Sequence, residues 1–263
     1  IPKAAGSVRG YVDDSFCIDE DSDGNLRIAT TEWSDDGGDQ ESSLYILDTN
    51  MKKIGSLKDF AGNEGIKSCR FMGNIGYIVT FRNTDPLFTI DLADPTDPKI
   101  LSKLTIPGFS EYLHYWGDGL LLGIGYDADI DDGETTGIKL SMFDVSDPGN
   151  TKEVAKLVLD VDDADILYGN YKSILIDPDK NLLGFTTSDW GDEDNNWKDS
   201  DYYMLFSYKD GKFRKLKRKK LDNEKYNTEN IRGIYAGDYF YLVCEMHIES
   251  YDMDGYKKIA TLE

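Results

Sequence analysis

A recurring pair of strand patterns constrains the fold of this chain more than any other feature. In each copy an apolar strand ends in Asp, a short polar turn follows, and a second alternating strand begins near a Lys. The positions are Asp48, Asp91, Asp144, Lys209 in place of Asp, and Asp252, so successive copies lie 43, 53, 65 and 43 residues apart. Repeats of about 40 to 50 residues are typical of propeller blades, with longer spacings explained by loop insertions.

Each copy can be laid out as four strands, bounded by Gly, Asp, Asn and Pro, with no convincing amphipathic helix between them. We therefore predict an all-β fold, a β-propeller of four-stranded antiparallel blades in a single domain over residues 1–263. The five expected blades span residues 7–60, 61–108, 109–163, 164–222 and 223–263. Either five blades close the ring, or the chain is a five-blade portion of a larger propeller.

The charge of the chain limits its partners. Fifty acidic residues against 29 basic ones give a formal net charge of -21, which repels phosphate backbones and anionic lipids. Nucleic acid and membrane surfaces are disfavoured, and a protein, a basic peptide or an uncharged glycan is the expected ligand of a monomeric protein. No apolar run approaches the ~20 residues that span a bilayer, and the N-terminal residues lack a signal-peptide pattern. Cys17, Cys69 and Cys244 lie in strand-like runs, where buried free thiols are expected.

Acidic insertions should gather on one face of the propeller, because loops between second and third strands share a face. These insertions cover residues 34–42, 127–137 and 188–201, and the segment 160–165 adds to the same side. Exposed aromatic rings beside carboxylates stack on sugar rings or take up cationic side chains. The candidate ligand-binding residues on this face are Trp33, Asp35, Asp36, Trp190, Asp192 and Trp197. The alternative is that the loops are only solvated and the tryptophans pack locally.

Basic residues fall on the expected first strands, which line the channel of a propeller. These further candidates are Arg70, His114, Lys172 and Arg232. They would either orient a polar ligand or pair with buried acids between blades. No catalytic residue is predicted, because His114 and His247 sit in no metal-binding or nucleophile spacing and fifty carboxylates make acid pairs unremarkable.

The series Asp19-x-Asp21-x-Asp23-Gly24 resembles the opening of a calcium loop. Counting from Asp19, position nine is Arg27 and position twelve is Thr30, so two expected oxygen ligands are missing. The segment is better explained as the hairpin between two strands, where Asp-Gly supplies a positive φ. If the protein uses Ca²⁺ as a cofactor, the acidic loop of the third blade is an equally good place for it. Its candidate ligands are Asp127, Asp129, Asp131 and Asp132.

Several long segments resemble, in order, a secreted bacterial β-propeller family that is distantly related to WD-repeat proteins. They include FCIDEDSDGNLRIATTEW, CRFMGNIGYIVTFRNTDPLFTIDLADPTDPKIL, IPGFSEYLHYWGDGLLLGIGYDAD, TGIKLSMFDVSDPGN and YKSILIDPDKNLLGF. The resemblance implies a propeller and an extracellular or cell-surface location in a bacterium. Because members of the family usually have a long preceding segment, it also implies that this chain is either a piece of a larger propeller or a shortened relative. It supplies no catalytic residues, since the family has no established activity.

These observations favour an extracellular, non-catalytic binding module that presents an acidic, Trp-bearing loop face to a cell-surface, matrix or glycan ligand. A propeller hydrolase acting on a polysaccharide through loop carboxylates is the alternative, and a purely structural module is the third hypothesis.

Overall fold

The computed structural model describes residues 3–34, 38–81, 85–129, 134–191, 198–222, 225–226, 230–245 and 247–262. The chain divides into two compact units. The first comprises Ile1–Thr136 and Ser141–Val154, and the second comprises Gly137–Leu140 and Ala155–Glu263. The predicted single domain and its blade boundaries stay predictions.

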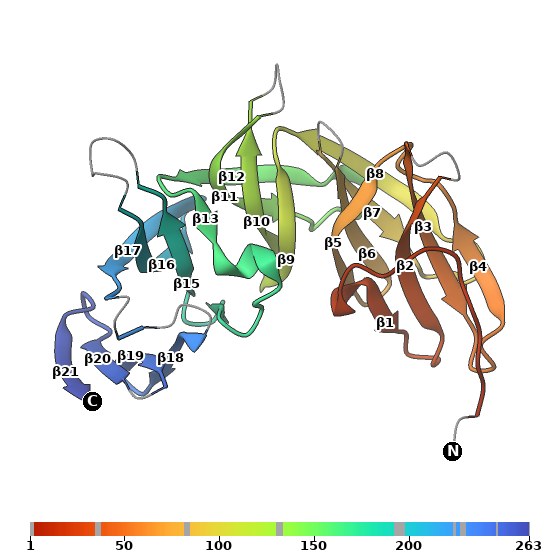
Figure 1. Cartoon of the computed structure of the whole chain (residues 1–263). Helices are drawn as coiled ribbons and strands as arrows, with labels where there is room; N and C mark the ends of the chain where they lie inside the picture. The colour runs from red at the N-terminus through yellow and green to blue at the C-terminus, as the bar shows by residue number, and fades with distance from the viewer. Residues whose placement is uncertain are drawn as a thin grey trace. The chain divides into compact units, whose positions relative to one another are not determined.

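Five antiparallel sheets make up the described structure, and in the first three the strands pair in chain order (Figure 1). The first sheet holds β1 (Ile18–Glu20), β2 (Leu26–Trp33), β3 (Gln40–Leu47) and β4 (Lys53–Leu57). The second holds β5 (Gly65–Met72), β6 (Ile75–Phe81), β7 (Asp85–Asp91) and β8 (Lys99–Ile106). The third holds β9 (Phe109–Gly117), β10 (Leu120–Ala128), β11 (Thr135–Asp144) and β12 (Lys152–Leu159). The predicted all-β propeller of four-stranded blades is confirmed.

The recurring Asp has the same role in three copies of the repeat, which is to close the turn after the third strand. Asp48 Oδ1 accepts hydrogen bonds from the backbone N–H groups of Asn50 and Lys52, each at 2.9 Å. Asp91 Oδ1 accepts from Ala93 N at 2.9 Å, and Asp144 Oδ1 accepts from Ser146 N at 3.0 Å. Side-chain capping of this kind fixes a tight turn and so sets the register of the fourth strand.

Alternation along β6 lets the second sheet pack on both of its faces. Ile78 lies in a core cluster with Ala29 and Leu44 of the first sheet. Tyr77 and Val79 point the other way and pack with residues of the third sheet, including Leu113 of β9. All of these side chains are buried, as expected for strands covered on two sides.

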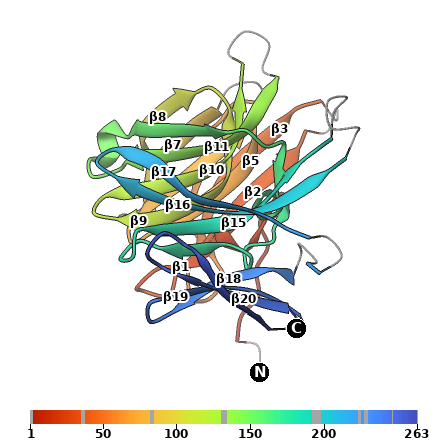
Figure 2. The same cartoon turned by 90° about the vertical axis from the view of Figure 1, so that its left-hand side faces the viewer.

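The fourth sheet departs from the predicted pattern because its inner strand is broken into two pieces. Both β13 (Asp163–Ala164) and β14 (Leu175–Asp177) pair with β15 (Leu182–Asp189), and the short helix η3 (Asp165–Tyr168) follows β13. Gly169 ends this helix in the left-handed region at φ 81°. Figure 2 shows β15 beside β16 (Ser200–Lys209) and β17 (Lys212–Lys220), which complete the sheet.

The fifth sheet contains β18 (Arg232–Ala236), β19 (Tyr239–Cys244), β20 (His247–Asp252) and β21 (Lys258–Leu262), paired in chain order. One face of it packs on the fourth sheet, with Phe240 and Leu242 in a core cluster that includes Tyr203 and Leu205. A Cβ at position 233 would collide with the Tyr203 hydroxyl, so this close approach of the two sheets requires glycine.

A buried carboxylate joins the fourth and fifth sheets. Glu249 of β20 is 3% exposed and accepts a hydrogen bond from the Tyr251 hydroxyl. Its Oε1 lies 2.5 Å from Lys258 Nζ, and its Oε2 lies 3.5 Å from Lys219 Nζ of β17. Burial raises the pKa of Glu249, but the bonds from Lys258 and Tyr251 and the charge of Lys219 outweigh it and lower that pKa to about 2.

Cys17, Cys69 and Cys244 are buried thiols that form no disulfide bond with one another, which agrees with the sequence prediction. A short helix, η1 (Ser15–Cys17), directly precedes β1, because Asp14 Oδ1 caps the N–H groups of Phe16 and Cys17. In the described parts of the chain, no helix is long and apolar enough to cross a membrane.

Candidate functional site

Trp190 presents an exposed indole ring on a backbone that is held from two sides. It directly follows β15 and is 58% exposed. Its backbone N–H donates to Asp162 Oδ2 at 2.6 Å, and the next N–H, of Gly191, donates to Asp199 Oδ1 at 2.9 Å. Because the backbone under this exposed ring is already held, less of the chain has to be ordered when a ligand stacks on the indole.

A cavity of about 510 Å³ lies at the broken inner strand of the same unit. Its lining comes from η3 and the residues after it, and from the segment before β18. The lining residues are Asp165, Tyr168, Gly169, Asn170 and Asn230. Tyr168 is 70% exposed, so the cavity offers one aromatic ring among carboxylate and amide groups.

One short segment connects the exposed tryptophan with this cavity. Asp162 binds the backbone of Trp190, the adjacent β13 pairs with Thr187 and Ser188, and η3 begins at the next residue. Asp162 N also donates to the Ser188 carbonyl at 3.0 Å. The segment 162–170 therefore both holds the backbone of Trp190 and lines the cavity.

Further contacts stiffen the strands behind the site. Ser188 Oγ donates to Asp201 Oδ1 at 2.7 Å. Arg218 Nη2 lies 3.2 Å from Asp189 Oδ2, and its guanidinium lies 3.9 Å from the centre of the Tyr202 ring. These contacts tie the end of β15 to β16 and β17, which supports the backbone that carries Trp190.

Trp33 lies in the other compact unit, at the end of β2, and is 57% exposed. Six of the predicted residues lie outside the described parts of the chain. They are the ligand-binding candidates Asp35, Asp36, Asp192 and Trp197 and the calcium candidates Asp131 and Asp132.

Arg70 and His114 come together on the inner strands β5 and β9. The Arg70 guanidinium donates to the Leu113 carbonyl, at 2.8 Å from Nε, and lies 4.1 Å from the centre of the Phe16 ring. His114 Nδ1 lies 3.0 Å from the Tyr112 hydroxyl. Burial and the Arg70 charge lower the pKa of His114 to about 4, so this imidazole is neutral at pH 7. The pair is built into the packing of the inner strands through a backbone carbonyl and aromatic side chains, whereas the sequence suggested pairing with buried acids.

The other two basic candidates differ from this pair. Lys172 is exposed and precedes β14, so it lies outside the inner strand expected for it. Arg232 is the first residue of β18, and its Nη1 donates to the Ile231 carbonyl at 2.6 Å.

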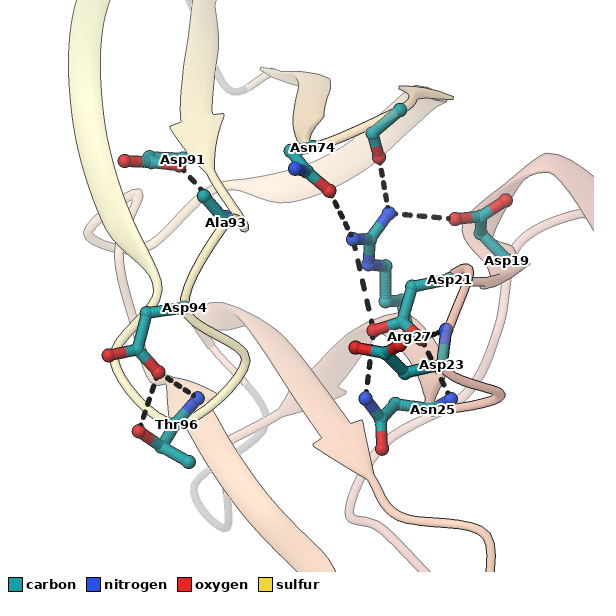
Figure 3. Close-up of polar contacts among 11 residues, drawn as sticks. Asp19, Asp21, Asp23, Asn25, Arg27, Asn74, Asp91, Ala93, Asp94 and Thr96 are labelled. Carbon is teal, nitrogen blue, oxygen red and sulfur yellow. Dashed lines mark hydrogen bonds and ion pairs between the residues drawn. The ribbon is translucent and has the colours of Figure 1, made fainter.

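The acidic series at residues 19–23 forms a turn around an internal cation, as Figure 3 shows. Arg27 is 2% exposed, and its Nη1 lies 3.1 Å from Asp19 Oδ2 and 2.6 Å from the Gly73 carbonyl of the neighbouring sheet. Asp21 accepts from the backbone N–H groups of Asp23 and Asn25, each at 2.9 Å. Burial raises the pKa of Asp21, but these bonds and the Arg27 charge lower it overall.

The structure therefore uses two of the three carboxylates of this series in contacts within the protein, as a hairpin turn requires. In the third sheet, Asp127 Oδ2 accepts from Thr136 Oγ1 at 3.5 Å, and Asp129 N donates to the Glu134 carbonyl at 2.9 Å. Within the described ranges, no group of three or more His, Cys, Asp or Glu side chains is placed to hold a metal ion.

The sequence contains no indication of the cavity, so four of its lining side chains were not predicted. They are Asp165, Tyr168, Asn170 and Asn230. The acidic segment 160–165 was expected on the acidic loop face, but nothing in its sequence indicated that the inner strand would be broken there. The one available signal was length, because the fourth repeat is 65 residues long.

Five antiparallel sheets that follow one another along the chain define a β-propeller protein. The chain belongs to the beta propeller domain family, whose model matches residues 2–256. An uncharacterized protein of Archaeoglobus fulgidus is 34% identical over 258 residues, which is 98% of this chain and 36% of the relative. The uncharacterized protein MJ1554 of Methanocaldococcus jannaschii is 35% identical over 248 residues, which is 93% of this chain and 36% of the relative. The chain thus spans about a third of the length of these curated relatives.

Two solved structures share the fold at low sequence identity. A eukaryotic initiation factor has a TM-score of 0.51 and 8% identity, with 94% of this chain and 54% of that chain covered. Apo AztD from Citrobacter koseri has a TM-score of 0.50 and 13% identity, with 91% and 57% covered. These likenesses show the fold alone.

Proposed function

We propose that this chain is a non-catalytic binding module that takes up a neutral glycan on a site formed by Trp190 and the cavity at η3. The observation that carries the proposal is the segment 162–170, which holds the backbone of Trp190 through Asp162 and lines the cavity with Tyr168 and Asn170. Sugar rings present apolar faces that stack on aromatic rings, and their hydroxyl groups pair with carboxylate and amide side chains.

The chemistry of the cavity favours binding over hydrolysis. Glycoside hydrolysis commonly requires two carboxyl groups that flank the bond to be broken. The described lining of this cavity supplies one carboxyl group, that of Asp165, beside two amides and a phenol. The net charge of -21 also favours a neutral or cationic ligand over an anionic polysaccharide.

An extracellular or cell-surface location is part of the same proposal. It is supported by the resemblance of residues 16–33 and 69–101 to secreted propellers that are distantly related to WD repeats. A bacterial source is the corresponding expectation, and both relatives named above are archaeal.

The test is calorimetric titration of the protein with a panel of neutral oligosaccharides, with oligolysine as the cationic comparison. We expect millimolar or tighter binding of a neutral glycan and a loss of roughly tenfold in affinity for Trp190→Ala, the size of an aromatic stacking contact. Asn170→Ala should weaken binding as well. Trp33→Ala is the matched control, since its indole has nearly the same exposure but lies in the other unit.

Three outcomes would reject this function. They are a panel without any binding, unchanged affinity in Trp190→Ala, and release of reducing ends from a bound polysaccharide, which would favour the hydrolase.

A further inference from the structure

Among the described residues of the second compact unit, only one face of the fifth sheet is covered. The face opposite Phe240 and Leu242 forms an apolar groove of about 550 Å³. Its lining residues are Ile234, Ala236, Tyr241, Val243, Ile248, Ser250, Ala260, Thr261 and Leu262. Ile234 is 48% exposed and Leu262 is 65% exposed, although both are side chains that proteins usually bury.

The second sheet shows what such a face is built to contact. One row of side chains across this sheet consists of Val79 of β6, its partner Leu87 of β7, and the partner of Leu87, which is Leu104 of β8. In the fifth sheet, Val243 pairs with Ile248, and Ile248 pairs with Leu262. The row reads Val-Leu-Leu across the second sheet and Val-Ile-Leu across the fifth sheet, so the two rows have the same apolar character.

The next row matches in the same way. In the second sheet this row consists of Tyr77, Thr89 and Ser102. In the fifth sheet it consists of Tyr241, Ser250 and Ala260. A tyrosine followed by a hydroxyl residue and a small residue thus recurs, two positions along each strand from the apolar row.

In the second sheet these rows are covered by the third sheet. Tyr77, Val79 and Leu87 are at most 2% exposed and share a core cluster with Phe109, Leu113 and Leu121. The small polar residues bond to the same neighbour, since Thr89 Oγ1 lies 2.9 Å from Thr151 Oγ1 and Ser102 Oγ donates to the Pro148 carbonyl at 2.9 Å. The rows are a blade-to-blade contact surface.

We propose that the groove of the fifth sheet is the contact surface for a further four-stranded blade, supplied by a longer polypeptide of which these residues form part. This blade would place large apolar side chains against Tyr241, Val243 and Ile248, and a hydrogen-bonding group opposite Ser250. The length of the relatives fits this occupant, because this chain accounts for only 36% of each.

The first sheet of the same chain is a poorer occupant, because its outer face already carries chain. Backbone at Gly6 and Gly10 lies against that face, where a Cβ at Gly6 would be 3.3 Å from Leu47 and one at Gly10 would be 3.0 Å from Thr30. Tyr11 N also donates to the Thr31 carbonyl at 2.8 Å.

The first test measures the groove with a dye that fluoresces on apolar surfaces, together with the mass of the protein in solution. We expect the 263-residue chain to be a dye-binding monomer and the double variant Val243→Lys, Ile248→Lys to lose most of the dye fluorescence without a large change in Tm. Leu101→Lys is the matched control, since Leu101 is a 39% exposed residue on the outer strand β8 and its replacement should leave dye binding intact.

The second test adds a blade. The chain is lengthened after its last residue with a second copy of residues 107–159, the sheet that covers the matching rows of β6 and β7. We expect dye binding to be lost and Tm to rise by roughly 3 °C or more, because apolar area is buried. Absence of dye binding in the starting chain would overturn the proposal, as would a dimer that the double variant dissociates. Dye binding that persists in the lengthened chain would overturn it too.

Discussion

Arg27 and Asp19 form an ion pair in which Nη1 lies 3.1 Å from Oδ2, and the guanidinium is 2% exposed. The same nitrogen donates to the Gly73 carbonyl, so one buried cation holds the acidic turn of the first sheet to the turn between β5 and β6. A cation supplied by the protein therefore sits where the sequence motif alone suggested a metal.

Arg27→Ala should lower the free energy of unfolding by roughly 3 kcal/mol, because it leaves buried acceptors without their donor. Arg27→Lys keeps the charge but cannot reach the carbonyl and the carboxylate in the same fixed geometry, so its loss should be smaller. Urea denaturation at pH 7 measures both. Equal stability of the Ala variant and the wild type would contradict the assigned role.

His114 should titrate far below an ordinary histidine, with a pKa of about 4, because burial and the charge of Arg70 both disfavour the imidazolium. NMR titration of the two histidines, assigned with a His114→Gln variant, measures this value. In Arg70→Gln the pKa should rise but stay below 6.5, since burial remains.

The sign of the resulting pH effect follows from the direction of the shift. The unfolded chain takes up this proton near pH 6.5 and the folded chain near pH 4, so the stability that His114 contributes is complete above pH 6.5 and is lost as the pH falls to about 4. A normal titration near pH 6.5 would mean that the ring is solvated.

The strands were predictable because period-two alternation and turn residues act locally. The repeat predicted strands that end at Asp91, Asp144 and Asp252, and β7, β11 and β20 end at these residues. Arg27 at position nine also argued correctly for a hairpin turn. Its partner Gly73 lies 46 residues away in another sheet, and no local pattern encodes that contact.

The candidate site was less predictable because it depends on an irregularity. The acidic, turn-rich segment after β12 gave no strand pattern, and the break between β13 and β14 is what brings Tyr168 and Asn170 to the cavity. The bond between Asp162 and Trp190 spans 28 residues and exists only because β13 pairs with the end of β15.

Glu249→Gln should destabilise the protein by roughly 2 kcal/mol at pH 7, because the buried carboxylate loses its charge toward Lys258 and Lys219, which are themselves partly exposed. The folded-state pKa of about 2 lies below the ordinary glutamate value, so this contribution is present above about pH 4.5 and is lost as the pH falls toward 2. Urea denaturation at pH 7 and pH 3 measures the change. Glu20→Gln, at an exposed carboxylate, is the control and should have little effect.

Val79 and Val243 hold the same row of their sheets, so a matched pair of substitutions separates a covered face from an uncovered one. Val79→Ser should cost roughly 2 kcal/mol or more, since it removes buried methyl groups and places a hydroxyl in a packed core. Val243→Ser should change the free energy of unfolding by about 0.5 kcal/mol or less, because solvent already reaches that face. Thermal or urea unfolding of the two variants gives the comparison. Equal losses would show that Val243 is covered in solution, and the exposed groove would then not exist in this chain.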